Sequence, residues 1–285
     1  MKKIFEVFWR FLFLGCISFG GPAAHIGYFQ KVFVGKLNWL DQTSFANLIS
    51  LSQFLPGPGS SQLGFAIGLR QAGLLGGIAA FLGFTLPSFI LLYFLAVNIS
   101  GAEQPWINHV IHGLKLLAVV VVADACLTMF KSFCHHHIHK IIALITTIIL
   151  IVSPNLTTQM LILIFAGGFG FLINQTLKPV MSDVAKPSSL VKNKLKLLPL
   201  SLFFTILLSL PLLIYLAPAN ESSKLVVLFN HFYQAGSMVF GGGHVVLPLL
   251  QQTIGETLSN DIFLTGYASA QAVPGPMFTL ATFLG

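Results

Sequence analysis

Charged residues are scarce in this chain of 285 residues, because Asp, Glu, Lys and Arg together make up only 8% of it. A soluble domain usually carries about 25% charged residues, so water could not solvate a globule of this composition. Hydrophobic types make up 55% of the chain, and the mean hydropathy is +0.85. The shortage of charge therefore excludes an ordinary soluble protein and indicates that lipid covers much of the surface.

Cysteine and acidic residues are also few. The three cysteines, Cys16, Cys126 and Cys134, have no framework spacing, which argues against structural disulfides. The net charge is +7, but the basic residues collect in loops, where they set the orientation of a membrane protein. Since no stripe of basic and aromatic residues suits bases, we expect no nucleic-acid partner.

Apolar stretches near the length of a membrane-spanning helix, about 20 residues, recur along the chain. We expect an all-α polytopic bundle in the lipid bilayer. Basic residues are present and absent in alternating loops, so the positive-inside rule places the N-terminus and the Lys178–Lys196 linker in the cytoplasm. The clearest expected spans are Leu74–Asn98, Ile107–Phe130, Ile138–Val152, Thr158–Thr176 and Leu197–Leu216.

Two further apolar regions, Lys2–Arg70 and Lys224–Gly285, are interrupted by glycine and proline. Such interruptions predict half-helices or re-entrant segments rather than continuous spans. The four interruptions are Gly20-Gly21-Pro22, Pro56-Gly57-Pro58, Gly241-Gly242-Gly243 and Pro274-Gly275-Pro276.

The interruptions belong to an internal repeat. A G-x-x-x-F-G-G element begins at Gly15 and again at Gly236, and a Q-x-x-P-G-P element begins at Gln53 and again at Gln271. Two pairs in the same order argue for a duplication. If Leu197–Leu216 crosses the membrane once, the two copies have opposite orientations, which is the inverted repeat of many secondary transporters.

The same runs resemble the signature motifs of the chromate transporter family. Phe19–His25, Gln53–Gln62 and Gly83–Ser88 are similar to those of its first domain, and Phe240–Pro248 and Ala270–Pro276 to those of its second. The resemblance implies a multi-pass protein of the bacterial inner membrane that exports chromate, with sulfate as a candidate exchange substrate. We expect no enzyme and no cofactor, and a homo-oligomer is possible.

The chain departs from the family pattern in charge and in length. Phe29–Asn38 keeps only two lysines, where family members usually carry more charge. Residues 1–177 form a complete first repeat, residues 178–196 a cytoplasmic linker, and residues 197–285 an extra span with the start of a second repeat. We therefore expect a C-terminally truncated transporter or a gene fragment.

Broken helices suit an oxyanion, because they expose backbone N–H groups at the positive end of a helix dipole. Glycine also allows close approach to the backbone. The alternative is that glycine and proline only kink and pack the helices. The expected substrate-binding residues are Gly20, Gly21, Pro22, His25, Gln53, Pro56, Gly57, Pro58, Ser61, Gln62, Gly241, Gly242, Gly243, His244, Gln271, Pro274, Gly275 and Pro276.

Three charged residues lie within apolar stretches and are further candidates. Arg10 either pairs with Glu6 one turn earlier or faces the anion path. Lys115 and Asp124 are too far apart to pair within one helix, so each either pairs across helices or serves a coupling proton. The histidine-rich run after Cys134 could suggest a metal, but a polar helix end explains it as well, and we expect no metal site.

Three other function classes remain. A transporter or channel for another small solute could use the same scaffold, since fold does not fix substrate. An intramembrane enzyme is disfavoured, because neither a His-Glu-x-x-His run nor a serine nucleophile elbow is present. The third is an inactive fragment.

Overall fold

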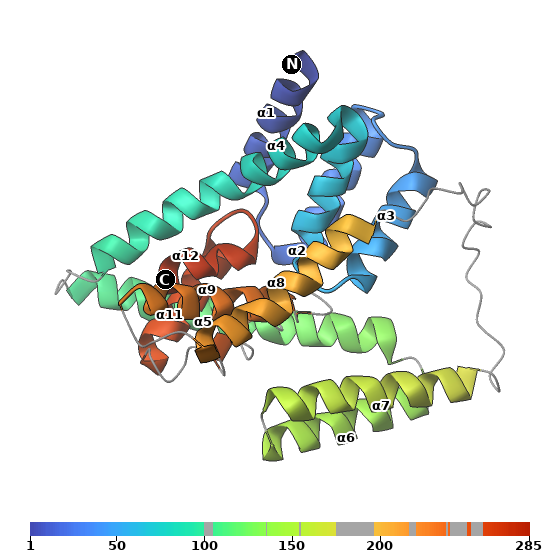
Figure 1. Cartoon of the computed structure of the whole chain (residues 1–285), viewed down its shortest axis with the longest axis vertical. Coiled ribbons are helices and arrows are strands. Elements are labelled where there is room, and N and C mark those ends of the chain that lie inside the picture. Colours follow the sequence, from blue (N-terminus) through green and yellow to red (C-terminus); the bar gives the residue numbers. More distant parts are fainter. Residues whose placement is uncertain are drawn as a thin grey trace. The chain divides into compact units, whose positions relative to one another are not determined.

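The computed structural model describes residues 1–99, 105–134, 136–153, 155–174, 197–216, 221–237, 239, 250–251 and 259–285. Every regular element in these ranges is a helix, which confirms the all-α fold (Figure 1). The elements are α1 Lys2–Ile17, α2 Gly21–Phe29, η1 Gln30–Lys36, α3 Gln42–Phe54, α4 Gly59–Ile99, α5 Pro105–Phe133, α6 His137–Val152, α7 Leu156–Asn174, α8 Leu197–Leu216, α9 Glu221–Ser237, α11 Asn260–Ala272, η3 Met277–Thr279 and α12 Leu280–Leu284.

The apolar stretches form helices close to the expected bounds. Helix α8 has the predicted limits, Leu197–Leu216, and α5, α6 and α7 match the three stretches before it. The stretch Leu74–Asn98 is the second part of α4, which breaks at Ala72 and Gly73, where Gly73 has a φ of +70°. Among the described residues, one helix, Gly59–Asn98, is long and apolar enough to cross a membrane.

The chain divides into two compact units. One contains Met1–Val122 and Leu197–Gly285, and the other contains Ala123–Lys196. In the second unit α6 and α7 pack against each other as a helical hairpin. The predicted substrate-binding residues all fall within the sequence limits of the first unit, so the account of the site concerns that unit alone.

Helices α1 and α4 form the main packing contact of the first unit, and two glycines allow their backbones to approach closely. A Cβ atom on Gly15 would lie 2.7 Å from the Phe84 carbonyl oxygen, and one on Gly83 would lie 2.6 Å from the Phe8 carbonyl oxygen. Small residues serve this purpose in membrane bundles, where close backbone packing replaces the hydrophobic drive between helices.

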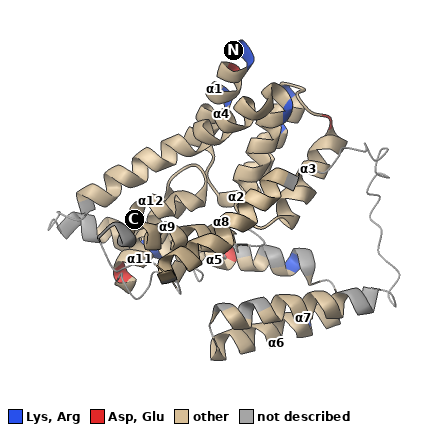
Figure 2. Ribbon diagram, viewed as in Figure 1, with Lys and Arg blue, Asp and Glu red and all other residues tan. Residues whose placement is uncertain are grey.

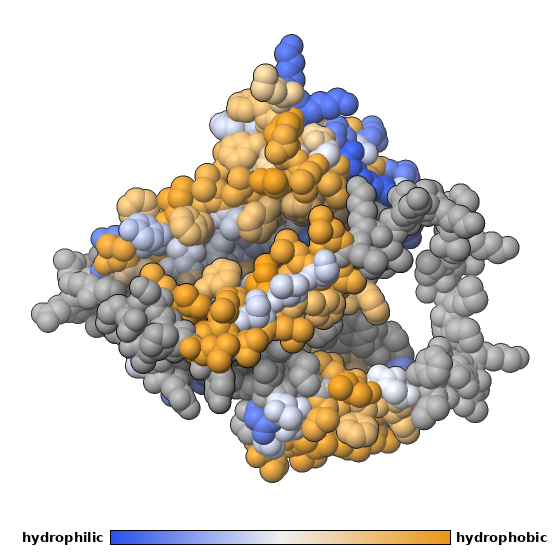
Figure 3. Space-filling view, in the orientation of Figure 1, coloured by the Kyte–Doolittle hydropathy of each residue, from blue (hydrophilic) through white to orange (hydrophobic). Residues whose placement is uncertain are grey.

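Phenylalanine fills the core beside this contact. The rings of Phe11 and Phe33 stack with their centroids 4.8 Å apart, and Phe29 and Phe84 meet edge to face at 5.1 Å. All four side chains are buried. Other large apolar side chains point outward, and Figure 3 shows hydrophobic residues over much of the visible face. An apolar exterior of this extent fits a bundle surrounded by lipid.

Candidate functional site

The first helix break lies between α1 and α2, at the predicted glycine element. Helix α1 ends at Ile17, and α2 begins at Gly21, where Gly20 and Gly21 take φ values of +95° and +73°. L-amino acids with a side chain rarely adopt such values, so glycine is required at this turn. Pro22 then lies in the first turn of α2, where its missing N–H is not needed. The predicted interruption is therefore confirmed.

The two Pro-Gly-Pro elements also interrupt helices, and each has a single backbone N–H, on its glycine, because proline has none. The Gly57 N–H donates to the Val239 carbonyl at 2.7 Å, and the Gly275 N–H donates to the Ser18 carbonyl at 2.9 Å. Both glycines have left-handed φ values, +122° and +110°. The one donor of each element is thus used in a contact with a distant part of the chain.

These two bonds are equivalent by the internal repeat. Aligning the G-x-x-x-F-G-G elements makes Ser18 the counterpart of Val239, and aligning the P-G-P elements makes Gly57 the counterpart of Gly275. Each glycine therefore bonds the other copy at the residue before its Phe-Gly-Gly run. Such a reciprocal pair arises when two similar elements meet about an approximate two-fold axis. We call this pair of bonds the crossed junction.

The helices that precede the P-G-P elements are built alike. Helices α3 and α11 both have 13 residues, and each begins after a side chain that accepts a hydrogen bond from the backbone N–H three residues later. The cap is Asp41 in the first copy and Ser259 in the second. The Ser44 backbone N–H, with its hydroxyl, holds the pKa of the exposed Asp41 carboxyl below its usual value.

The Ser18 side of the crossed junction is polar and buried. His25 and Ser18 are both 0% exposed, and Ser88 is 1% exposed. A Cβ on Gly275 would lie 2.9 Å from the Ser88 Oγ, so α4 touches the junction. Ser88 and Thr85 lie near the middle of Leu74–Asn98, and the Oγ atoms of Thr85 and Ser18 have no partner among the described residues. A buried set of this kind is a candidate ligand site.

His25 has a defined hydrogen-bonding role in this set. Its Nε2 lies 3.2 Å from the Ser18 carbonyl oxygen, and its ring packs edge to face against Phe84 at 5.1 Å. A carbonyl can only accept, so Nε2 carries the proton of the neutral ring. A neutral His25 in this arrangement has no N–H left for an oxyanion, because its one N–H donates to the Ser18 carbonyl.

The expectation that the amides around Gly57 face the anion also needs correction. The Gly57 N–H is bonded to Val239, so it is not free. The Gln62 Nε2 donates to the Pro56 carbonyl at 2.7 Å and closes the turn from within. Ser61 and Gln62 border a cavity of about 370 Å³ between α3 and α4, but most of its lining is apolar. A doubly charged anion would find too few donors there.

The remaining predicted residues are less closely grouped. Gln53 is exposed at the end of α3, whereas the Gln271 Nε2 donates to the Tyr267 hydroxyl at 2.9 Å. Pro58 supplies the carbonyl that begins α4. Pro274 and Pro276 are buried beside Gly275. Gly241, Gly242, Gly243 and His244 lie outside the described residues.

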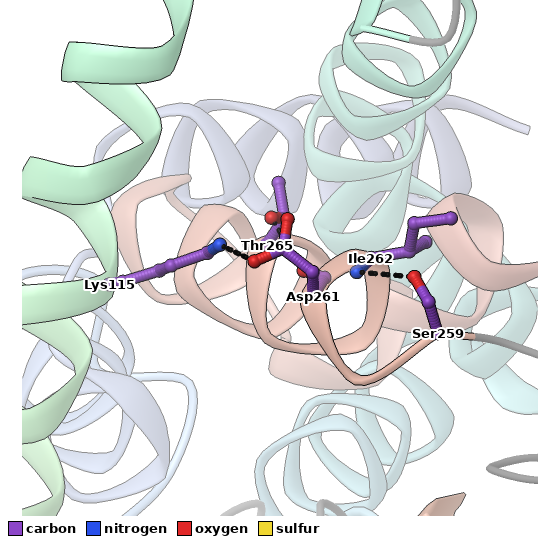
Figure 4. Close-up of polar contacts among 5 residues, drawn as sticks. All are labelled: Lys115, Ser259, Asp261, Ile262 and Thr265. Atoms are coloured by element: carbon purple, nitrogen blue, oxygen red, sulfur yellow. Dashed lines mark hydrogen bonds and ion pairs between the residues drawn. The ribbon is translucent and has the colours of Figure 1, made fainter.

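Lys115 pairs with a residue that the sequence analysis did not consider. Its Nζ lies 2.5 Å from Asp261 Oδ1, which joins α5 to the first turn of α11 (Figure 4). This is the one ion pair of the described residues, whose ribbon carries few charges (Figure 2). Arg10 is exposed and not paired with Glu6, and Asp124 is exposed. Lys115 thus pairs across helices, as one of its two alternatives predicted.

Comparison with known proteins gives one family and several relatives. The model of the chromate transporter family matches residues 5–171 and 226–285. A probable chromate transport protein of Synechococcus elongatus is 28% identical over 96% of this chain and 67% of its own length. The chromate transport protein of Pseudomonas aeruginosa is 26% identical over 98% of this chain and 65% of its own length. An uncharacterized transporter of Methanocaldococcus jannaschii is 26% identical over 98% of this chain and 68% of its own length.

The chain spans about two thirds of the length of these curated relatives. No solved structure matches it.

Proposed function

Because the chain belongs to the chromate transporter family, and is thus a membrane transport protein, we propose that it is a secondary transporter of tetrahedral oxyanions, with chromate as its main substrate. Relatives named as chromate transport proteins align with nearly the whole chain. We propose further that the flux is outward across the bacterial inner membrane, with sulfate as an exchange substrate.

The observation that carries this proposal is the crossed junction. It joins the glycine of a Pro-Gly-Pro element in one copy to the residue before the Phe-Gly-Gly run of the other copy, in both directions. On its Ser18 side it meets the middle of Leu74–Asn98, whose length suits a span. Secondary transporters commonly bind substrate near the bilayer midplane, where their repeats meet at broken helices. The buried hydroxyls of Ser18 and Thr85, which have no partner among the described residues, would donate to an oxyanion there, whereas the Ser88 hydroxyl already donates to the Thr85 carbonyl.

The two copies are proposed to have opposite orientations. The axis of a two-fold relation can lie in the membrane plane or along the membrane normal. The number of spans between the two copies decides which direction the axis has. The first copy takes residues 1–177 and starts in the cytoplasm, the linker 178–196 is cytoplasmic, and α8 then crosses once, so that the second copy starts outside.

This orientation predicts the labelling of two single cysteines in a chain whose native cysteines are replaced. Ser189→Cys should react with a membrane-impermeant thiol reagent only after the cells are permeabilised. Asn220→Cys should react in intact cells. Both positions lie outside the described residues. Labelling of both from the same side would rule out the inverted repeat.

The substrate class is tested by chromate uptake into proteoliposomes that contain the purified chain. Sulfate in excess should reduce chromate flux severalfold, because sulfate matches the charge and the tetrahedral shape of chromate. Chloride or a neutral solute at the same concentration as the sulfate should leave the chromate flux unchanged. Protein-free liposomes give the background. Equal inhibition by chloride would indicate an unselective anion channel, and no chromate flux with transport of another solute would favour the alternative function on this scaffold.

A further inference from the structure

His25 is fully buried, unlike the other histidines whose exposure the structure describes. Its ring is held between the Ser18 carbonyl, which accepts from Nε2 at 3.2 Å, and the Phe84 ring. Because Nε2 keeps its proton for this bond, Nδ1 of the neutral ring carries a lone pair. Nδ1 has no hydrogen-bond partner in the described part of the chain. Nδ1 is therefore the one ring atom of His25 that can take up a proton.

The charge of this ring decides whether an oxyanion is attracted to the junction. A neutral ring offers a lone pair at Nδ1, which repels an oxyanion, whereas a protonated ring is a cation. In a buried site of low dielectric constant, the attraction between a cation and a dianion is strong. Binding of the oxyanion and binding of the proton therefore favour each other, by the same factor in each direction.

Resting on the proposed function, we propose that each oxyanion binds together with one proton, which His25 takes on Nδ1. The proton comes from solvent and forms a new N–H bond at Nδ1. Nε2 keeps its own proton and continues to donate to Ser18, and no other bond forms or breaks. The dianion and the imidazolium together carry one negative charge, so the site holds half the charge of the free substrate.

No other ionisable group takes this role on the elements that pack around α2. Tyr28 on α2 itself is half-buried, and the remaining groups are exposed to the surface. Those exposed groups are Lys2, Lys3, Glu6, Arg10 and Cys16 on α1, Lys31 and Lys36 on η1, and Arg70 and Tyr93 on α4.

The two sides of the crossed junction differ at this point. Extending the alignment of the Phe-Gly-Gly runs places Val239 and Val246 where the first copy has Ser18 and His25. Valine binds no proton, so at this aligned position only the first copy has a residue that can take one. The inference therefore specifies one proton per bound oxyanion.

The test counts the protons taken up when chromate binds to the 285-residue chain in detergent, by calorimetry in buffers that differ in ionisation enthalpy. Above neutral pH the wild type should take up about one proton more per chromate than His25→Gln. Glutamine can still donate to the Ser18 carbonyl but does not titrate, and the proton that chromate itself can bind is common to both proteins. His139→Gln, which alters an exposed histidine of α6, should behave as the wild type.

The outcomes separate the inference from the function on which it rests. Equal proton counts for wild type and His25→Gln, with chromate bound by both, would overturn the inference and leave the proposed function standing. No binding of chromate or sulfate by the wild type would instead contradict the proposed function. Should His25→Gln fail to fold, ¹⁵N NMR of labelled histidine in the wild type decides. The Nε2-protonated neutral ring should become imidazolium when sulfate, which stays a dianion, is added, and an unchanged neutral ring would overturn the inference.

Discussion

Replacing Gly275 with leucine should abolish oxyanion transport while the protein stays in the membrane. Gly275 has a φ of +110°, and a side chain in left-handed backbone costs roughly 1–2 kcal/mol. A Cβ there would also lie 2.9 Å from the Ser88 Oγ and 3.1 Å from the Ser88 Cβ. Relief of these contacts must move Gly275 away from Ser18 and open the crossed junction on its polar side.

The measurement is chromate flux into proteoliposomes, with membrane abundance and thermal stability recorded for each variant. Gly113→Leu is the matched control, because Gly113 lies in α5 with nothing within 4 Å of its Cβ position. We expect flux at background for Gly275→Leu and near the wild-type value for Gly113→Leu. Loss of the protein from the membrane together with its activity would show that Gly275 serves packing alone.

Local structure in this chain was predictable because glycine, proline and apolar runs act over a few residues. The breaks at Gly20-Gly21-Pro22 and at both P-G-P elements lie where the sequence places them, and α8 has the predicted limits. The start of the long apolar span at Leu74 also agrees with the structure, since α4 breaks at Ala72 and Gly73. Each of these features depends on local backbone preference or on the length of an apolar run.

The hydrogen-bond partners of the two P-G-P glycines could not be predicted from local sequence. Sequence spacing showed that each P-G-P element has one N–H, but the acceptor lies in the other copy and depends on how the copies dock. This is why the Gly57 amide was expected to face the substrate, whereas it donates to Val239. The internal repeat held a usable signal, because two copies related by a two-fold axis exchange equivalent contacts.

The partner of Lys115 was missed for a similar reason. Asp261 is the one acidic residue of α11, so an otherwise apolar bundle offers few counter-ions for the half-buried Lys115. That scarcity could have suggested the pair, whereas helix periodicity could not. The choice of tautomer for His25 likewise required the Ser18 carbonyl, which approaches only after the chain turns at Gly20 and Gly21.

Replacing Gly57 with leucine should also abolish transport, although Gly57 belongs to the first copy and bonds Val239 rather than Ser18. Its φ is +122°, and a Cβ there would lie 2.6 Å from the Gln62 Nε2. The Gln62 side chain is flexible, but moving it breaks its bond to the Pro56 carbonyl. The loss of this turn should release the Gly57 N–H from Val239 and separate the copies.

The central claim is that both copies build one transport pathway through the crossed junction. It is tested most directly by chromate flux per reconstituted molecule, measured side by side for the wild type, Gly57→Leu and Gly275→Leu at equal membrane abundance. One shared pathway predicts background flux for each single variant. If either single variant kept about half of the wild-type flux or more while the protein remained folded, the copies would work independently and the account of a shared site would be contradicted.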